Sequence, residues 1–336
     1  MGVTKDNMIK HSDKRWYILQ PVYGGKWSIP DASLPWTNDC NIALGRLLQA
    51  PASHFSNEDI DLTADIYYMI IFNVDHYEKE LELIKKLKSL NKKVILTFSA
   101  DMRFLTGEGL LGHQGINYTD LCAEADLVIS GVPENIKFYG RYQHKVISMG
   151  VFLERLNFSN SVLPKDIDIL MSGSIFRNEP SLSFALELMC ILKEKYPDKK
   201  ISYPTRHKWL LQPRYPQIDF IEAEDYMYNT GLVPLLQRSK VYINPELRPN
   251  PGRAMIEAFY CRVPYICSSM SYPAKYIPDF TYDNMNFDTI INQYEMLINS
   301  DLTKIMRTAE ELAEEDYFDN AIQRIMDRLY PEGDSI

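Results

Sequence analysis

The chain has 336 residues, with 36 lysines and arginines against 45 aspartates and glutamates, so its formal net charge is −9. At roughly 100–200 residues per domain, this length predicts two domains and a sizeable core. Apolar residues make up 46% and charged residues 24%, a balance that excludes a disordered chain. The acidic excess argues against a broad basic face of the kind that binds duplex DNA. A local basic cleft is still compatible with this net charge.

The cysteines and the N-terminal residues predict a cytoplasmic protein. The five cysteines are odd in number and have no C-x-x-C spacing, which argues against a disulfide framework and a zinc site. Residues 1–15 are polar throughout and lack the apolar region of a signal peptide. No uninterrupted apolar stretch approaches the roughly 20 residues that span a bilayer, so we expect no integral membrane segment.

The first half of the chain alternates short apolar runs with amphipathic stretches. We expect strands at 15–22, 65–73, 92–99, 125–132 and 144–151. After the second of these, residues 77–90 place Leu81, Ile84, Leu87 and Leu90 on one side at helical spacing. Strands that are apolar on both faces and alternate with helices indicate a parallel sheet covered on both sides.

A polar stretch at 152–165 interrupts the alternation of apolar runs and amphipathic stretches, which resumes after it. We expect further strands at 167–174, 199–205, 218–223, 241–246 and 263–269. Helices are expected at 180–197, 231–240 and 253–262, followed by a helical region at 287–329. The sequence therefore predicts two α/β domains, 1–155 and 156–336, with the option that the last helix crosses back to the N-terminal domain. Ligands are expected at the carboxyl ends of the strands, in the crevice between the domains.

Residues 244–269 form the most specific segment, in which a strand leads through a proline-rich loop into a helix that starts near Gly252. A helix start presents free N–H groups and a positive dipole, which together favour an anion. Arg248 and Arg253 flank this start and could clamp phosphate, while Glu257 could accept hydrogen bonds from a ribose diol. The alternative is a surface helix whose glutamate and arginines face water.

The second half of this segment, Glu-Ala-Phe-Tyr-Cys-Arg-Val-Pro, resembles a motif in the C-terminal domain of GT-B glycosyltransferases. The similarity is to the retaining group that uses nucleotide sugars, such as glycogen synthase, sucrose synthase and bacterial mannosyl- and glucosyltransferases. The residues that match in register are Glu257, Ala258, Cys261 and Pro264, and Arg262 stands where the family has glycine. Weaker similarities extend over most of the chain in the order in which the family has them.

The resemblance implies an α/β protein of the GT-B fold, with two Rossmann-like domains facing each other across a cleft. The N-terminal domain would hold the acceptor, and the C-terminal domain a UDP- or GDP-linked sugar. The implied reaction is transfer of that sugar to an acceptor hydroxyl with retention of anomeric configuration. It needs no cofactor besides the donor, and no metal. The acceptor is left open between a glycan, a lipid-linked glycan, a small molecule and, less favoured, modified DNA.

The resemblance also implies a donor-binding set drawn from loops that follow the strands. These residues are Gly24, Gly25, Lys26, Gly173, Ser174, Arg177, Arg206, Ile221, Gly252, Arg253, Ala254 and Glu257. Backbone N–H groups at Gly24 and Gly25 could approach a phosphate, although an ordinary tight turn is the alternative. Arg177 is the candidate for the diphosphate contact. The loop with Arg206 could approach the nucleotide, with a solvated basic loop as its alternative.

Two polar residues are candidates for catalysis on the acceptor side. His76 follows the strand at 65–73, and Asp101 follows the strand at 92–99, so both are expected at the carboxyl edge of the first sheet. A solvent-exposed histidine and a helix-capping aspartate are the alternatives.

The sequence departs from the family's pattern at two places. Pro249 stands eight residues before Glu257, where the family has its first glutamate, and Ser174 and Glu179 stand where it has arginine and lysine. These departures keep open a degenerate protein that binds without catalysis. A nucleotide-sugar epimerase of the same fold is the other alternative.

Three short motifs are not interpreted as ligand-binding sites. Gly107–Gly112 matches G-x-G-x-x-G but lies beyond the end of its strand, which argues against a dinucleotide fingerprint. The pairs Asp59/Asp61 and Asp166/Asp168 have metal-type spacing. Both pairs precede strands, so we expect them at the far side of the sheets from any ligand.

Overall fold

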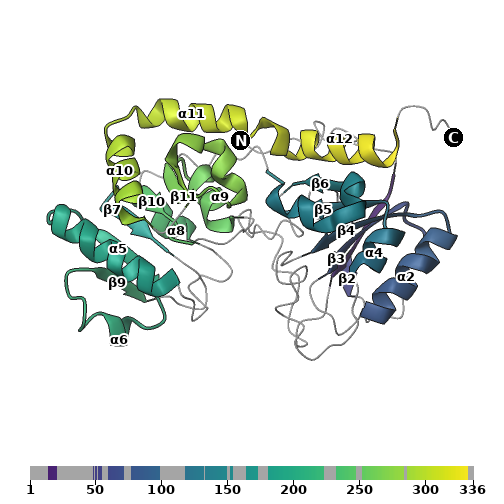
Figure 1. Cartoon of the computed structure of the whole chain (residues 1–336), viewed down its shortest axis with the longest axis horizontal. Coiled ribbons are helices and arrows are strands. Elements are labelled where there is room, and N and C mark those ends of the chain that lie inside the picture. Colours follow the sequence, from purple (N-terminus) through teal and green to yellow (C-terminus); the bar gives the residue numbers. More distant parts are fainter. Residues whose placement is uncertain are drawn as a thin grey trace. The chain divides into compact units, whose positions relative to one another are not determined.

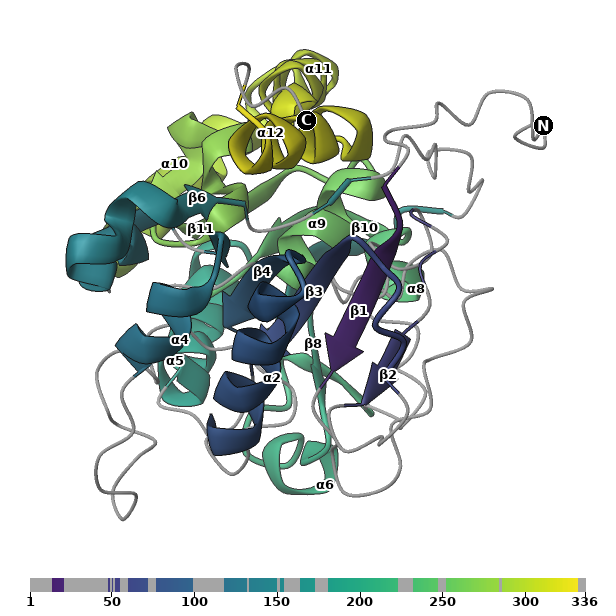
Figure 2. The same cartoon turned by 90° about the vertical axis from the view of Figure 1, so that its right-hand side faces the viewer.

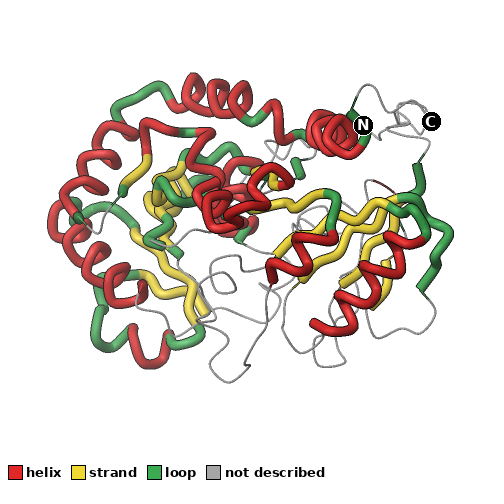
Figure 3. The backbone as a smooth tube through the Cα atoms, turned by 45° about the vertical axis from the view of Figure 1, so that its right-hand side comes forward, coloured by secondary structure: helices red, strands yellow, loops and turns green. Residues whose placement is uncertain are grey.

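The structure is a computed structural model of the chain. It describes residues 14–20, 48, 50, 52–54, 60–71, 77–98, 118–131, 133–149, 152–153, 164–172, 181–222, 232–246, 252–283 and 286–331. The chain divides into two compact units, the second of which contains Arg155–Glu314, while Glu315–Ile336 belong to the first. Each unit is a parallel sheet between helices (Figure 3).

The first sheet has the strand order β2-β1-β3-β4-β5-β6, and all its pairs are parallel. Its strands are β1 Trp16–Gln20, β2 Ala52–His54, β3 Ile66–Ile71, β4 Lys93–Phe98, β5 Leu127–Ser130 and β6 Val146–Ser148. The five strands expected in this half of the chain are present, each somewhat shorter than its apolar run. The edge strand β2 was not expected, because three residues carry no periodic signal.

Helices cover both faces of this sheet. They are α2 Tyr77–Ser89, α4 Tyr118–Glu124, the 3-10 segment η3 Pro133–Lys145, and α12 Phe318–Leu329. Figure 2 shows α2 and α4 side by side in front of the strands, and Figure 1 shows α12 lying over the first unit. On β3, Tyr67, Met69 and Ile71 pack with α2, while Ile66, Tyr68 and Ile70 pack with α12. Alternate residues are therefore buried on opposite faces, as a parallel sheet requires.

One buried side chain of α2 breaks the apolar pattern. Glu80 lies one turn before Ile84 and two turns before Leu87, on the face that packs against the sheet, and it is 1% exposed. Neither carboxylate oxygen has a hydrogen-bond partner. Burial raises the pKa of Glu80 to about 8, because no neighbouring charge offsets the loss of water.

The second sheet has the order β12-β11-β10-β7-β8-β9 and is also parallel. Its strands are β7 Ile167–Met171, β8 Ile201–Thr205, β9 Asp219–Glu222, β10 Ser239–Ile243, β11 Tyr265–Ser268 and β12 Thr281–Tyr282. The sequence places the start of β10 at 241, but Ser239 already pairs with Ile167 of β7. The expected helix at 231–240 is correspondingly short.

The helices of the second unit follow its strands in turn. They are α5 Ser181–Lys195, α6 Lys208–Leu211, α8 Val233–Leu236, α9 Arg253–Tyr260, α10 Phe287–Ile298 and α11 Leu302–Leu312, with 3-10 turns η4 Tyr272–Tyr276, η5 Pro278–Phe280 and η6 Glu314–Asp316. Asn286 and Asp301 cap α10 and α11, each accepting a bond from an N–H of the first turn. Across the described residues, no helix combines the length and apolarity that crossing a membrane requires.

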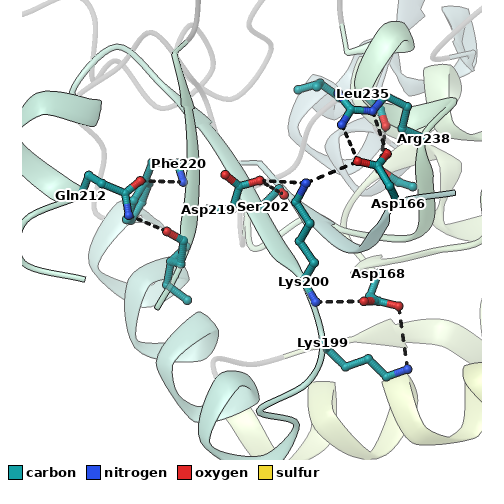
Figure 4. A network of polar contacts seen from close by, with 12 residues as sticks. Asp166, Asp168, Lys199, Lys200, Ser202, Gln212, Asp219, Phe220, Leu235 and Arg238 are labelled. Carbon is teal, nitrogen blue, oxygen red and sulfur yellow. Dashed lines mark hydrogen bonds and ion pairs between the residues drawn. The ribbon is translucent and has the colours of Figure 1, made fainter. Parts of the chain in front are cut away.

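The amino ends of the second sheet carry a network of charged groups (Figure 4). Asp166 accepts two hydrogen bonds from Arg238, at 2.8 and 2.5 Å, and Asp168 pairs with Lys240 at 2.8 Å. The Arg238 hydrogen bond holds the pKa of Asp166 well below its usual range. The pair Asp166/Asp168 thus lies at the amino edge, as its position before the strand predicts, and its partners there are cations of the chain.

Arg262 closes α9 in a conformation that favours glycine. Its φ is 53°, in the left-handed region. The N–H of Arg262 bonds to the carbonyl of Phe259, and that of Val263 to the carbonyl of Ala258, which are the two bonds of a Schellman motif. Asn91, with φ 57°, ends α2 in the same way. The structure therefore explains why the family that this segment resembles has glycine at this position.

Replacing Arg262 with glycine is expected to stabilise the second unit by about 1 kcal/mol, because the left-handed strain is removed. The guanidinium pairs with Glu310 at 2.6 Å on the surface, so the comparison belongs in a Glu310→Ala background. Urea unfolding gives the free energy. Asn91→Gly is the matched control and should gain only a few tenths of a kcal/mol, since asparagine tolerates this region. Equal gains at both positions would contradict the explanation.

Candidate functional site

The start of α9 lies at the carboxyl edge of the second sheet, directly after β10. Its N-cap residue, Gly252, has φ 77° and is buried. A Cβ there would lie 2.3 Å from Cδ of Pro273 and 2.9 Å from Cε of Met255. The Tyr265 hydroxyl donates to the Pro273 carbonyl at 2.8 Å and so fixes the proline. Only glycine fits at this helix start, both in conformation and in space.

The first turn of α9 has three backbone N–H groups without an acceptor inside the helix. The first hydrogen bond inside the helix runs from the N–H of Ile256 to the carbonyl of Gly252. The N–H groups of the three preceding helical residues therefore have no acceptor within the helix, and the helix dipole adds positive potential. The sequence prediction of an anion site at Gly252, Arg253 and Ala254 falls on this turn.

Glu257 is buried one turn further along α9, with 2% exposure. Its Oε2 accepts a 2.6 Å bond from the N–H of Leu232, and its Oε1 accepts a 2.8 Å bond from Nε of Arg253. Burial raises the pKa of Glu257, while the charge of Arg253 and the Leu232 N–H act in the opposite direction. The alternative of a glutamate that faces water is therefore wrong.

Glu257 still has capacity for a ligand. Each of its oxygens accepts one bond from the protein, and a carboxylate oxygen has two lone pairs. Arg253 is 41% exposed, so part of its guanidinium faces solvent beside the helix start. A buried acidic acceptor and a half-exposed cation thus lie one turn apart on the helix whose first-turn N–H groups have no acceptor within the helix.

Two further side chains hold residues 244–246, which directly follow β10. The amide of Asn244 is buried, and its Nδ2 donates to Sδ of Met255 at 2.8 Å, while its Oδ1 accepts from the N–H of Glu246 at 2.9 Å. The hydroxyl of Tyr282 donates to the carbonyl of Asn244 at 2.5 Å. These roles could not be predicted from the sequence, because the hydrogen-bonding partners lie on separate elements.

A similar contact fixes the carboxyl end of β7. The buried hydroxyl of Tyr242 lies 2.7 Å from Oγ of Ser172, the residue that follows the strand. Ser172 directly precedes Gly173, the first of the predicted donor-binding residues on this loop. The contact therefore fixes the point at which the loop leaves the sheet.

Arg206 and Ile221 lie at the same edge of the sheet but on other strands. Arg206 directly follows β8 and is half-buried, and Ile221 of β9 pairs with Pro204 of β8. Strand β7 separates β8 from β10, so these two residues lie further along the carboxyl edge than α9. The second unit thus brings Gly252, Arg253, Ala254 and Glu257 onto one helix, and it places Arg206 and Ile221 at the same edge of the sheet, on strands that β7 separates from β10.

The remaining candidates lie outside the described residues. They are Gly24, Gly25, Lys26, His76, Asp101, Gly173, Ser174 and Arg177. Within the described ranges, no group of three or more histidine, cysteine or acidic side chains is placed to hold a metal ion. Among the described cysteines, Cys190, Cys261 and Cys267 are free thiols.

No family model matches the chain, and no curated protein matches it. Solved structures do match. A glycosyltransferase from Rickettsia africae aligns with a TM-score of 0.59 and 12% identity, covering 96% of this chain and 100% of the other. MnaA of S. aureus, solved with UDP, aligns at 0.54 and 13%, covering 94% and 96%. The UDP-GlcNAc 2-epimerase of Neisseria meningitidis, bound to UDP-GlcNAc, aligns at 0.51 and 12%, covering 94% and 99%.

These similarities span nearly the whole chain and define its class by fold. The protein is an α/β protein of the GT-B fold, with two Rossmann-like domains. The solved structures that share this architecture include both glycosyltransferases and epimerases.

Proposed function

We propose that the protein is a glycosyltransferase that takes a sugar from a nucleotide diphosphate-sugar and transfers it to an acceptor hydroxyl with retention. The observation that carries this proposal is the buried Glu257 on a helix whose first-turn N–H groups have no acceptor within the helix. The motif around Glu257 resembles the donor segment of retaining GT-B enzymes. Two of the matched structures contain UDP or UDP-GlcNAc, which supports a UDP-linked donor.

The proposed roles follow from the chemistry of the departing diphosphate. The free N–H groups of the first turn of α9, with Arg253 beside them, would stabilise the negative charge that develops on it. Glu257 would accept hydrogen bonds from the ribose hydroxyls. Arg177 would add a cation to the diphosphate, and His76 and Asp101 would line the acceptor side. The reaction would use no cofactor or metal besides the donor.

An epimerase is the second candidate, because the matched structures include the UDP-GlcNAc 2-epimerase of Neisseria meningitidis, with 94% of this chain and 99% of the other covered. The two functions differ in what they need. An epimerase turns over UDP-GlcNAc alone, whereas a transferase needs an acceptor for more than slow hydrolysis. Incubation of the protein with UDP-GlcNAc, followed by NMR of the sugar, therefore distinguishes them.

Replacing Glu257 with alanine is expected to weaken binding of the cognate nucleotide about tenfold to a hundredfold, because the ribose loses charge-assisted hydrogen bonds. A thermal-shift panel of UDP, GDP, ADP, CMP and dTDP first identifies that nucleotide, since a ligand stabilises the state it binds. Calorimetry then gives the affinity. Glu257→Gln keeps an acceptor for the Leu232 N–H and should lose less.

Glu311→Ala is the control, because it removes an exposed glutamate of α11 in the same unit. It should leave the affinity unchanged. Unchanged affinity in folded Glu257→Ala would remove the proposed role of this residue. No thermal shift with any of the five nucleotides would favour a degenerate protein without donor binding.

A further inference from the structure

The short helix α6 presents a tryptophan to solvent. Trp209 is 73% exposed, more than the other exposed large apolar side chains that the structure describes, among which Met296 follows at 55%. Tryptophan is usually more buried, because water disfavours its large apolar ring. Its exposure therefore marks a candidate contact surface.

The position of Trp209 is fixed by its neighbours. Leu211, two residues later, is buried against the sheet. The side chain of Gln212 donates to the carbonyl of Ile218 at 2.9 Å and accepts from the N–H of Phe220 at 3.3 Å, which ties the end of α6 to β9 (Figure 4). The ring is thus held outward on an anchored turn.

The surroundings of Trp209 are basic in an otherwise acidic protein. Residues 201–218 contain Arg206, Lys208 and Arg214, together with His207, and no aspartate or glutamate. Within the described chain, Lys208 and Arg214 form no ion pair, so their charge is available to a partner. The whole chain carries a net charge of −9 and residues 201–218 carry +3, so the rest of the molecule carries −12, and attraction for an anionic partner is concentrated at this turn.

A surface of anionic lipid headgroups fits these features best. Tryptophan prefers the interface between headgroups and acyl chains, and nearby lysine and arginine are attracted to anionic lipids. Single-stranded nucleic acid is also bound by aromatic and basic residues, but it uses a groove in which bases stack. A ring that is 73% exposed on a four-residue helix stands free of such walls.

We propose that α6, with Trp209 as the inserted ring and Lys208 and Arg214 as the charged contacts, docks the protein on membranes that contain anionic lipids. The inference rests on α6 alone and not on the proposed nucleotide site. Its failure is therefore distinguishable from a failure to bind nucleotide.

Co-sedimentation of the full chain with vesicles tests the proposal. The protein should bind vesicles of phosphatidylcholine with about one-third phosphatidylglycerol, and not phosphatidylcholine alone. Trp209→Ala should weaken this binding about tenfold. Lys208→Ala with Arg214→Ala should weaken it by about fivefold per charge and reduce its salt dependence.

Leu312→Ala is the matched control, because it removes an exposed apolar side chain elsewhere in the second unit and should leave vesicle binding unchanged. Each variant's melting temperature confirms that it is folded. The proposal is overturned if wild type does not bind the anionic vesicles, or if folded Trp209→Ala binds them as wild type does. Tight binding of a single-stranded oligonucleotide that depends on Trp209, without vesicle binding, would overturn it in favour of a nucleic acid.

Discussion

Replacing Glu80 with glutamine is expected to abolish a loss of stability that the wild-type protein suffers as the pH rises from about 4.5 to 8. Glu80 has an ordinary pKa of 4.5 in the unfolded chain, and burial raises its pKa to about 8 in the folded one. Between these values the unfolded state gives up the proton and the folded state keeps it, so the unfolded state is favoured increasingly. The expected loss is about 3 kcal/mol at pH 7.

Urea unfolding of the wild type and of Glu80→Gln at several pH values gives the free energy of unfolding of each protein. Hydrogen exchange in α2 is then measured on the same two proteins. The difference between the two proteins should grow from pH 5 to pH 8 and then level off. Glu78→Gln is the control, because Glu78 is exposed in the same helical turn. Glu80→Leu should stabilise further, since a leucine leaves no buried polar atom without a partner. A difference that does not vary with pH would show that Glu80 ionises normally.

Replacing Gly252 with alanine is expected to destabilise the second unit by about 2–4 kcal/mol, the sum of left-handed strain and overpacking against Pro273. The added Cβ would lie 2.3 Å from the proline ring, so either the ring or the helix start must move. Because the same backbone forms the proposed anion site, nucleotide binding should weaken as well. Thermal unfolding and calorimetry measure the two effects.

Gly140→Ala is the matched control for this substitution. Gly140 has a positive φ of 52°, but no atom lies within 4 Å of the position of its missing Cβ. Its ψ of −121° differs from the left-handed ψ of 39° at Gly252, so Gly140→Ala shows the cost of a positive φ without a contact, about 1–3 kcal/mol. A destabilisation of Gly252→Ala that Pro273→Ala does not relieve would show that the contact with Pro273 does not constrain Gly252. Partial rescue of Gly252→Ala by Pro273→Ala would identify the clash directly.

The fold could be predicted largely from apolar runs. Strands such as β3 and β4 are buried on both faces, so they appear as continuous apolar stretches and are easy to locate. The start of β10 was placed late, because the polar Ser239 and Lys240 mask the first residues of the strand. The short helix α6 was missed because four residues cannot show a helical period.

The candidate site could be predicted only in part. Glu257 stood out because its helix is otherwise apolar, and Gly252 because it follows a proline-rich loop. The partner of Glu257, however, is the backbone N–H of Leu232, and the neighbour of Gly252 is Pro273. Both contacts are set by tertiary packing between distant segments, and neither the spacing nor the composition of the sequence encodes them locally.

Helix α12 gives the protein an unusual order of assembly. Its residues Phe318, Ile322 and Ile325 close one face of the first sheet, yet they leave the ribosome only after the whole second unit has been synthesised. While the second unit is being synthesised, Trp16, Ile18 and other core residues on that face of the first sheet therefore remain uncovered. Most of the second unit, Arg155–Glu314, is continuous along the chain and is synthesised before α12, so we expect maturation here to run opposite to the usual N-to-C sequence of domain folding during translation.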